Sequence, residues 1–205
     1  MIRVDTSVGR DALFDFHRKI EPRIYESDPT HESRIVFSRK LLKDAIKLFP
    51  IDRWPLQILE LGCGTADISG PEHGVHEVAG VDCNTAAIKI AESRFPLGTW
   101  QCSAIEDVQP SLPRDILVLC ETLEHLDNPV EIVGRWFPFC EVAIITHPLG
   151  ESANREIGGA EHVWHSLTDE DLSRWALIGG HSILRKEHFT VGGYRFGALI
   201  SKRKP

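Results

Sequence analysis

The stretch Gln57-Ile-Leu-Glu-Leu-Gly-Cys-Gly-Thr65 decides the fold of this 205-residue chain. Its first five residues are mostly apolar, which predicts a strand buried on both faces of a parallel sheet. Gly62 and Gly64 follow, and glycines at such positions let the backbone turn sharply and pass close to a ligand. A second apolar run, residues 78–81, ends at Asp82, twenty residues after Gly62. In nucleotide-binding α/β sheets, an acid at about that distance hydrogen-bonds a ribose.

A third motif, Asp115-Ile-Leu-Val-Leu-Cys-Glu-Thr-Leu-Glu-His-Leu126, predicts another buried strand and a polar turn. Together with Glu60-Leu-Gly-Cys-Gly64 and Gly80-Val-Asp82, it resembles three motifs of the class I S-adenosylmethionine (SAM)-dependent methyltransferases. The motifs occur in the family's order, and the resemblance covers roughly residues 56–167. A dinucleotide-binding Rossmann domain is the alternative, but it expects Gly-x-Gly-x-x-Gly, and residues 62–67 lack the last glycine.

The resemblance implies an α/β fold with a Rossmann-like seven-stranded sheet, helices on both faces and a C-terminal antiparallel hairpin. Residues 1–50 are expected to form a short N-terminal helical cap, and residues 51–205 the SAM-binding domain, within one structural unit. The apolar patterns also predict helices at 11–20, 32–48, 86–94, 128–136 and 168–177, strands at 99–102, 115–119 and 141–146, and hairpin strands at 182–190 and 194–201.

Two segments depart from the family pattern. After the glycine turn, Gly70-Pro71 predicts that the usual helix ends after barely one turn, which would leave His73 and His76 in a solvated loop. In the loop that contacts adenine in the family, Ser103 stands where an aspartate is common. A serine hydroxyl or the loop backbone could make the same contact.

The composition indicates a cytoplasmic protein without a large phosphate-binding face. No apolar run approaches the roughly 20 residues of a membrane span, and Met1-Ile-Arg-Val-Asp5 lacks the form of a signal peptide. The five cysteines contain no Cys-x-x-Cys pair and lie in or beside apolar stretches, so we expect buried free thiols in a reducing compartment. The net charge of −7 disfavours a nucleic acid partner, and no membrane partner is expected. The oligomeric state is left open.

The family resemblance implies SAM as the cofactor and S-adenosylhomocysteine (SAH) as its product. The residues that it assigns to the cofactor are Glu60, Gly62, Cys63 and Gly64 on the methionine and ribose side, Asp82 at the ribose hydroxyls, Cys83 beside adenine, Ser103 and Ala104 at the adenine edge, and Glu121 near the sulfonium.

Methyl transfer from a sulfonium mainly requires the nucleophile, methyl and sulfur to be held in line, and a base is needed only for a nucleophile of high pKa. The candidate catalytic residues are Glu124, His125 and a later histidine, His165. If a helical turn begins at Glu121, then Glu121, Glu124 and His125 lie roughly on one side of it. Three interpretations stay open: Glu124 and His125 order a loop, His125 acts as a base, or the cluster binds a divalent metal with His165 or His147.

The Glu-x-x-Glu-His pattern at 121–125 resembles two branches of the family. One is the ubiquinone-type O-methyltransferases, and the other is the metal-dependent small-RNA 3′-end 2′-O-methyltransferases. We therefore expect O-methylation of a small molecule, with a divalent-metal-dependent RNA ribose methyltransferase and a non-catalytic SAM-binding subunit as alternatives. The acceptor would enter beneath the N-terminal helices and the 147–166 loop, with Tyr25, His31 and Arg34 as candidate lid contacts.

Overall fold

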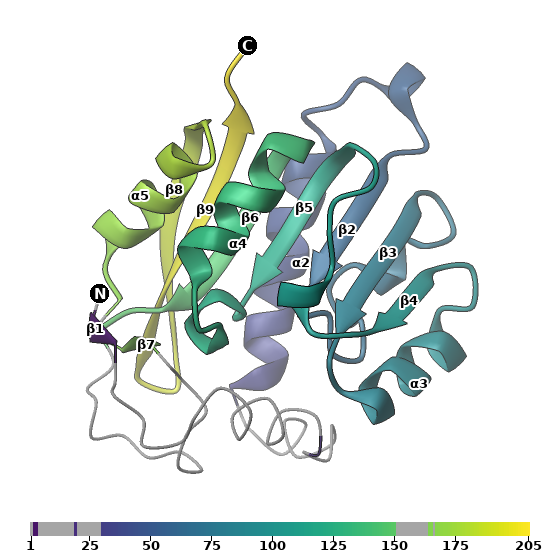
Figure 1. Cartoon of the computed structure of the whole chain (residues 1–205), viewed down its shortest axis with the longest axis horizontal. Coiled ribbons are helices and arrows are strands. Elements are labelled where there is room, and N and C mark those ends of the chain that lie inside the picture. Colours follow the sequence, from purple (N-terminus) through teal and green to yellow (C-terminus); the bar gives the residue numbers. More distant parts are fainter. Residues whose placement is uncertain (1, 4–18, 20–29, 151–163, 166) are drawn as a thin grey trace.

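The computed structural model describes residues 2–3, 19, 30–150, 164–165 and 167–205. Its main feature is a seven-stranded sheet in the order β4-β3-β2-β5-β6-β9-β8 (Figure 1). The first five strands are parallel, whereas β9 runs antiparallel to both β6 and β8. The strands are β2 (Gln57–Leu61), β3 (Glu77–Asp82), β4 (Thr99–Cys102), β5 (Arg114–Cys120), β6 (Cys140–Pro148), β8 (His181–Val191) and β9 (Tyr194–Arg203). The predicted sheet and its C-terminal hairpin are confirmed.

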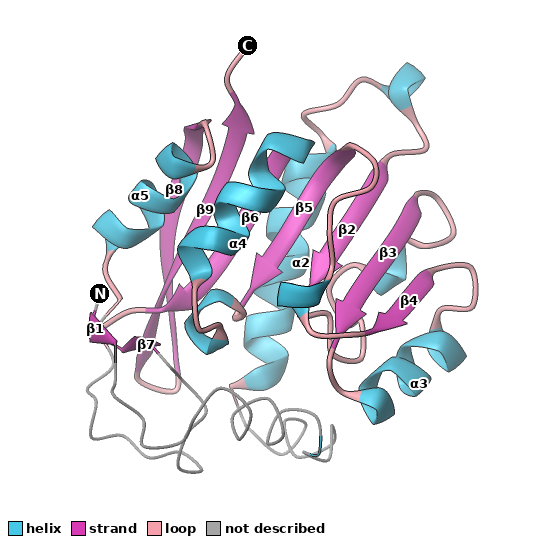
Figure 2. Ribbon diagram, viewed as in Figure 1, coloured by secondary structure: helices cyan, strands magenta, loops and turns pink. Residues whose placement is uncertain are grey.

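Helices cover both faces of the sheet, and alternate residues of the central strands face opposite sides. Ile116 and Val118 of β5 pack with α2, while Leu117 and Leu119 pack with α4 and α5. Figure 2 shows α4 and α5 in front of the sheet and α2 behind it. The α-helices are α2 (His31–Ile46), α3 (Thr85–Arg94), α4 (Pro129–Trp136) and α5 (Asp169–Ile178). Short 3₁₀ turns are η2 (Ile51–Arg53), η3 (Gly70–Glu72), η4 (Ile105–Asp107), η5 (Leu123–His125) and η6 (Phe137–Phe139).

The helix starts follow the polar residues that the sequence places there. The Asn84 side chain accepts hydrogen bonds from the amides of Ala86 and Ala87, which caps α3. Thr168 and Asp171 form a reciprocal capping box at the start of α5. These caps determine where α3 and α5 begin, and the predicted helices after β3 and before β8 are confirmed.

The connection between β2 and β3 contains no α-helix in residues 62–76, all of which are described; turns and η3 replace it. The predicted early end of this helix is therefore confirmed. The prediction of two solvated histidines is wrong for His76, which is buried because its Nδ1 atom accepts a hydrogen bond from the Leu56 amide at 3.2 Å. Gly70 fits under the Phe95 ring, since an added Cβ would lie 2.4 Å from that ring.

The hairpin β8–β9 forms one edge of the sheet and carries a bulge between Ile183 and Arg185. Its turn packs on the start of α2, because a Cβ at Gly192 would lie 2.4 Å from a Thr30 methyl carbon. Two short strands, β1 (Ile2–Arg3) and β7 (Trp164–His165), pair antiparallel beside the main sheet. A strand at Ile2–Arg3 differs from the predicted helical character of the whole N-terminal segment.

Several predicted features lie outside the described residues: the helix at 11–20 (apart from Lys19), Tyr25 and most of the 147–166 loop. The prediction that all cysteines are buried is wrong for Cys102, which is exposed, and for Cys83, which is half-buried. Among the helices that the structure describes, none has both the length and the apolar character that a bilayer span requires.

Candidate functional site

The glycine turn after β2 and the segment after β5 meet at the carboxyl ends of the parallel strands, along the lower edge of the sheet in Figure 1. Gly62 has a φ of +74°, and an added Cβ would lie 2.6 Å from the Oγ1 atom of Thr122. Thr122 is itself fixed, because its hydroxyl donates to the carbonyls of Leu61 and Cys120. The two segments therefore form one continuous surface at the sheet edge.

Gly64 opens a space beside an acidic residue. Its φ is +51°, and a Cβ placed there would meet no heavy atom within 4 Å. Asp82 accepts the amide of Gly64 at one carboxylate oxygen and the amide of Asn84 at the other, both at 2.8 Å. Burial raises the pKa of Asp82, and the backbone hydrogen bonds from Asn84, Gly64 and Cys83 counter part of that rise. The Asp82 carboxylate is thus held in one orientation at the open turn.

Glu60 lies beneath the turn rather than at its surface. Its side chain is buried, and one carboxylate oxygen accepts the Ser69 amide at 3.1 Å and the Ser69 hydroxyl at 2.5 Å. Burial raises the pKa of Glu60 to about 7, an effect that Asp67 and Asp82 add to and the Ser69 hydrogen bonds oppose. Glu60 therefore ties the strand to the segment that replaces the missing helix.

Asp67 anchors the same segment to two helices. Its carboxylate lies 2.8 Å from Arg94 of α3 and 3.8 Å from Arg39 of α2, and Arg39 also donates to the Asp67 carbonyl at 2.5 Å. In the absence of a helix, these contacts and the Glu60–Ser69 pair hold the glycine turn in place.

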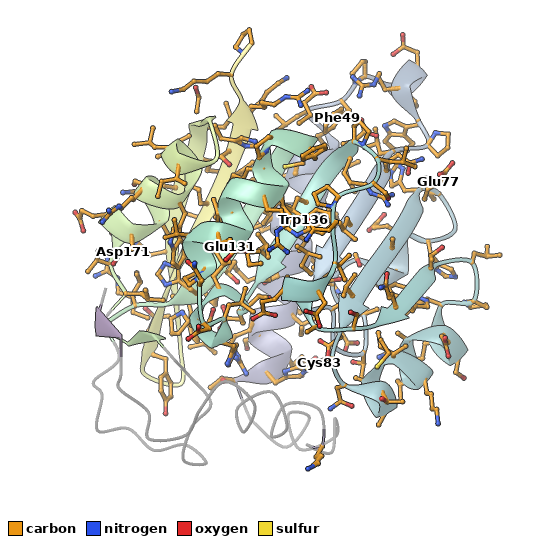
Figure 3. All side chains as sticks on the ribbon, viewed as in Figure 1. Phe49, Glu77, Cys83, Glu131, Trp136 and Asp171 are labelled. Atoms are coloured by element: carbon orange, nitrogen blue, oxygen red, sulfur yellow. The ribbon has the colours of Figure 1, made fainter. Side chains whose placement is uncertain are left out.

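The residues predicted at adenine lie beyond the ends of β3 and β4. The Ser103 amide donates to the Asp82 carbonyl at 2.9 Å, and its hydroxyl donates to the Ala104 carbonyl at 3.2 Å. Ala104 is buried, whereas Cys83 is half-buried and lies beside α3 (Figure 3). Burial raises the pKa of the Cys83 thiol to about 12, so the thiol stays protonated and does not act as a nucleophile.

Glu121 follows β5 in a left-handed conformation, with a φ of +53°. Its amide donates to the Thr146 carbonyl at 3.0 Å, which extends the β5–β6 pairing by one residue. The Thr146 hydroxyl donates to one Glu121 carboxylate oxygen at 2.9 Å, and Arg34 of α2 approaches the other at 3.4 Å. Three groups from two elements thus fix this one residue.

The predicted helical turn from Glu121 to His125 is wrong in its start. The left-handed Glu121 leaves the helical path, and only Leu123–His125 forms a 3₁₀ turn, η5. Glu124 is fully buried in this turn and His125 is half-buried, so Glu121 and Glu124 do not share one helical face. His165 lies on β7, whose backbone runs beside η5, so the fold brings the third candidate near the other two.

The residues considered for a metal do not form a described ligand cluster. His147 is fully buried in β6, where its Nδ1 atom lies 2.8 Å from the Pro148 carbonyl and its ring packs edge-on against Trp175. Within the described part of the chain, no group of three or more histidine, cysteine, aspartate or glutamate residues is placed to hold a metal ion.

Residues 59–137 match the family model described as a methyltransferase domain. This match covers the central part of the chain, from β2 to the end of α4. A search of curated proteins gave no match.

Solved structures show the same fold over nearly the whole chain. Magnesium protoporphyrin IX methyltransferase from Synechocystis PCC 6803, crystallised with SAM, has a TM-score of 0.75 at 12% identity and covers 98% of this chain and 100% of its own. The N-methyltransferase NodS from Bradyrhizobium japonicum WM9, crystallised with SAH, has a TM-score of 0.71 at 12% identity and covers 94% and 97%. The plantazolicin methyltransferase BpumL, also with SAH, has a TM-score of 0.64 at 14% identity and covers 95% and 98%. The predicted SAM-dependent methyltransferase fold is confirmed.

Sequence reasoning missed the residues that support the candidate site. The motifs assign no role to Asp67, Ser69, Thr122 or Thr146, whose partners Arg94, Glu60, Leu61 and Glu121 lie 9 to 61 residues away in the chain. Arg34, a candidate lid contact, also lies 3.4 Å from the Glu121 carboxylate, a pairing that the sequence did not predict. A signal did exist for Ser69, because a buried glutamate in a strand requires a hydrogen-bonding partner.

Proposed function

We propose that this chain is a methyltransferase that takes its methyl group from SAM and transfers it to a hydroxyl group of a small molecule. The observation that carries the cofactor assignment is the open space at Gly64 beside the oriented carboxylate of Asp82. The Asp82 carboxylate accepts the backbone amides of Gly64, Asn84 and Cys83, and a carboxylate can accept about four hydrogen bonds, which leaves a position for a further donor. A ribose hydroxyl is a suitable further donor.

The other cofactor residues fit around this position in our proposal. Gly62, Cys63 and Gly64 allow the methionine part to pass close to the backbone, with Glu60 holding the turn from below. The remaining predicted contacts lie at the neighbouring strand ends and are Cys83, Ser103 and Ala104 at adenine and Glu121 towards the sulfonium.

When bound, SAM supplies a methyl group that is already activated for displacement. The chain then has to orient the acceptor, exclude water and receive a proton. Glu124, His125 and His165 remain candidates for the acceptor side, since η5 and β7 lie together at the same sheet edge as the glycine turn. The solved structures of this fold name different compounds, magnesium protoporphyrin IX in one and a pentazolic desmethylPZN analogue in another, so fold alone does not choose among acceptors.

The RNA-type alternative needs Glu121 as a metal ligand. The pairing of Glu121 with Arg34 and Thr146 argues against that role, because a cation would have to displace a guanidinium. The negative net charge also opposes an extended phosphate-binding surface.

Calorimetric titration of SAM and SAH, each with Mg²⁺ and with EDTA, tests the proposal. We expect binding of both ligands without metal, and its loss in Asp82→Ala, because the ribose hydroxyls lose their acceptor. Asp107→Ala is the matched control, since Asp107 is an exposed acid of the neighbouring η4. Absence of SAM and SAH binding in the wild type would overturn the proposal.

The same protein preparation separates the alternatives. Binding that requires Mg²⁺ would bring the RNA ribose methyltransferase forward. Tight SAM binding without turnover on a broad panel of hydroxyl and amine acceptors would favour a non-catalytic SAM-binding subunit.

A further inference from the structure

We propose that the Glu121 carboxylate accepts the hydrogen of the acceptor's nucleophilic atom, and that Arg34 and Thr146 position it for this role. The acceptor class is then a hydroxyl or amine compound, whose reacting atom carries a hydrogen. This inference rests on the proposed function, because it places Glu121 at the point where the methyl group is transferred.

The backbone of Glu121 is the first observation. Left-handed backbone is unfavourable for a residue with a Cβ, by about 1–2 kcal/mol, and such residues concentrate at functional sites. Glu121 adopts it while its amide still bonds to Thr146 of β6. The residue is thus as firmly placed as a strand residue, although the chain turns away from the sheet after it.

The carboxylate is the second observation. One oxygen accepts the Thr146 hydroxyl, the other lies near Arg34, and the side chain is 20% exposed. A ligand group can reach the carboxylate through its exposed part, and both carboxylate oxygens are hydrogen-bond acceptors. The exposure is small, which means that a ligand group reaching Glu121 exchanges little water and binds in a fixed direction.

The neighbourhood of the glycine turn is the third observation. Residue 122 touches the position where a Cβ of Gly62 would be, so Glu121 is next to the segment that we assign to SAM. An acceptor X–H bound between them would donate its hydrogen to Glu121. As the X–CH₃ bond forms, the S–CH₃ bond breaks with its electron pair on sulfur, and the proton passes from X to the carboxylate.

Arg34 is a positioning residue in this arrangement. Its side chain is 20% exposed, comes from the first turn of α2 and lies over the Phe196 ring at 5.8 Å from the centroid. The helix holds the guanidinium in place because the later turns of α2 are buried against the sheet. Arg34 therefore restrains the Glu121 carboxylate and does not need to touch the acceptor.

The test needs no knowledge of the acceptor. Sinefungin is a SAM analogue in which a carbon bearing an amine replaces the sulfur bearing the methyl, so its ammonium occupies the transfer position. We expect calorimetry to show that sinefungin binds about tenfold or more tightly than SAH, since a charge-assisted hydrogen bond forms with Glu121. Glu121→Gln should reduce this preference to about threefold or less, because it weakens sinefungin binding more than SAH binding. Glu77→Gln is the control, because Glu77 lies at the opposite end of the strands (Figure 3).

Arg34 variants distinguish positioning from simple charge. If Arg34 acted only as a cation, Arg34→Met would strengthen the binding of the sinefungin ammonium. Positioning predicts that Arg34→Met weakens it and that Arg34→Lys restores most of the preference. If Glu121→Gln does not fold, Thr146→Val can be used in its place, because it also releases the Glu121 carboxylate and should reduce the preference for sinefungin over SAH.

The outcomes are distinct. SAH binding without a preference for sinefungin, or a preference that survives in Glu121→Gln, overturns the role of Glu121 and leaves the proposed function standing. Absence of both SAM and SAH binding overturns the proposed function and this inference together. Stronger sinefungin binding in Arg34→Met overturns the positioning role of Arg34.

Discussion

The segments after β2 and after β5 both turn through left-handed backbone at the same sheet edge, but with different residues. The first uses Gly62 and Gly64, which adopt that conformation without a steric penalty, and the second uses Glu121. Glycine makes a turn that leaves room for a ligand. Glutamate makes a turn that presents a charged group, and the surrounding contacts must offset its strain. The glycine turn after β2 thus allows a ligand to lie close to the backbone, whereas the segment after β5 holds a side chain in a fixed position.

The largest effect is expected from a substitution that disrupts the contact between the two segments. Gly62→Ala should lower the free energy of unfolding by about 3 kcal/mol, because it combines a left-handed alanine with a clash against Thr122. Gly64→Ala, with open space around its Cβ, should lower it by only about 1 kcal/mol. Urea unfolding measures both. In the double variant Gly62→Ala/Thr122→Ala, the part of the stability loss that comes from the clash should disappear. An equal stability loss in Gly62→Ala and Gly64→Ala would contradict the packing argument.

The second prediction concerns pH and the support below the glycine turn. The pKa of Glu60 is raised to about 7, so the folded state binds its proton more tightly than the unfolded chain does. Its contribution to stability is complete below about pH 4.5 and is lost as the pH rises through 7. Relative to Glu60→Gln, whose amide oxygen can still accept from Ser69, the wild type should lose about 3 kcal/mol across that window.

Urea unfolding of wild type and Glu60→Gln at several pH values checks this. The difference between the two proteins cancels the titration of other groups, such as Asp82. A difference that stays constant with pH would show that Glu60 is charged in the folded protein.

The third prediction tests what replaces the missing helix. Asp67→Ala removes the pairs with Arg94 and Arg39 and should cost about 1 kcal/mol of stability. It should also weaken SAM binding, since the glycine turn loses an anchor. Asp44→Ala is matched in exposure and in its two cationic partners but lies away from the turn. We expect a similar small stability loss there with SAM affinity unchanged, as measured by calorimetry.

The smallest effect isolates the strain at Glu121. Glu121→Gly and Glu121→Ala both remove the carboxylate, but only glycine relieves the left-handed backbone. Glu121→Gly should therefore be the more stable of the two by about 1 kcal/mol in urea unfolding. At Glu131, within the helical backbone of α4, the order should reverse, with glycine the less stable. The same order at both positions would argue against strain at Glu121.

The sequence was sufficient for the fold because short-range patterns specify it. Apolar runs, the Asn84 and Thr168 caps and the Gly70-Pro71 break predicted the elements that the structure confirms. The position of Asp82 beside the glycine turn also followed, because parallel strands bring their carboxyl ends to one edge. Resemblance to a family added the cofactor assignment.

The supporting contacts of the site could not be read from the sequence. Arg34 is 87 residues away from Glu121 in the chain, and nothing local shows that they meet. The left-handed conformation of Glu121 has no sequence signal either, since glutamate normally avoids it. The same applies to His76, whose burial depends on the amide of Leu56, 20 residues earlier.

The bulge in β8 has a consequence for how the molecule behaves at high concentration. Strand β8 is the longest of the described strands and forms an outer edge of the sheet, where unpaired backbone groups can recruit the strand of another molecule and start aggregation. The irregularity at Ile183/Arg185 interrupts the even row of donors and acceptors that such pairing needs. The charged run of Arg185, Lys186 and Glu187 follows directly. The edge is thereby made a poor template for fibril growth.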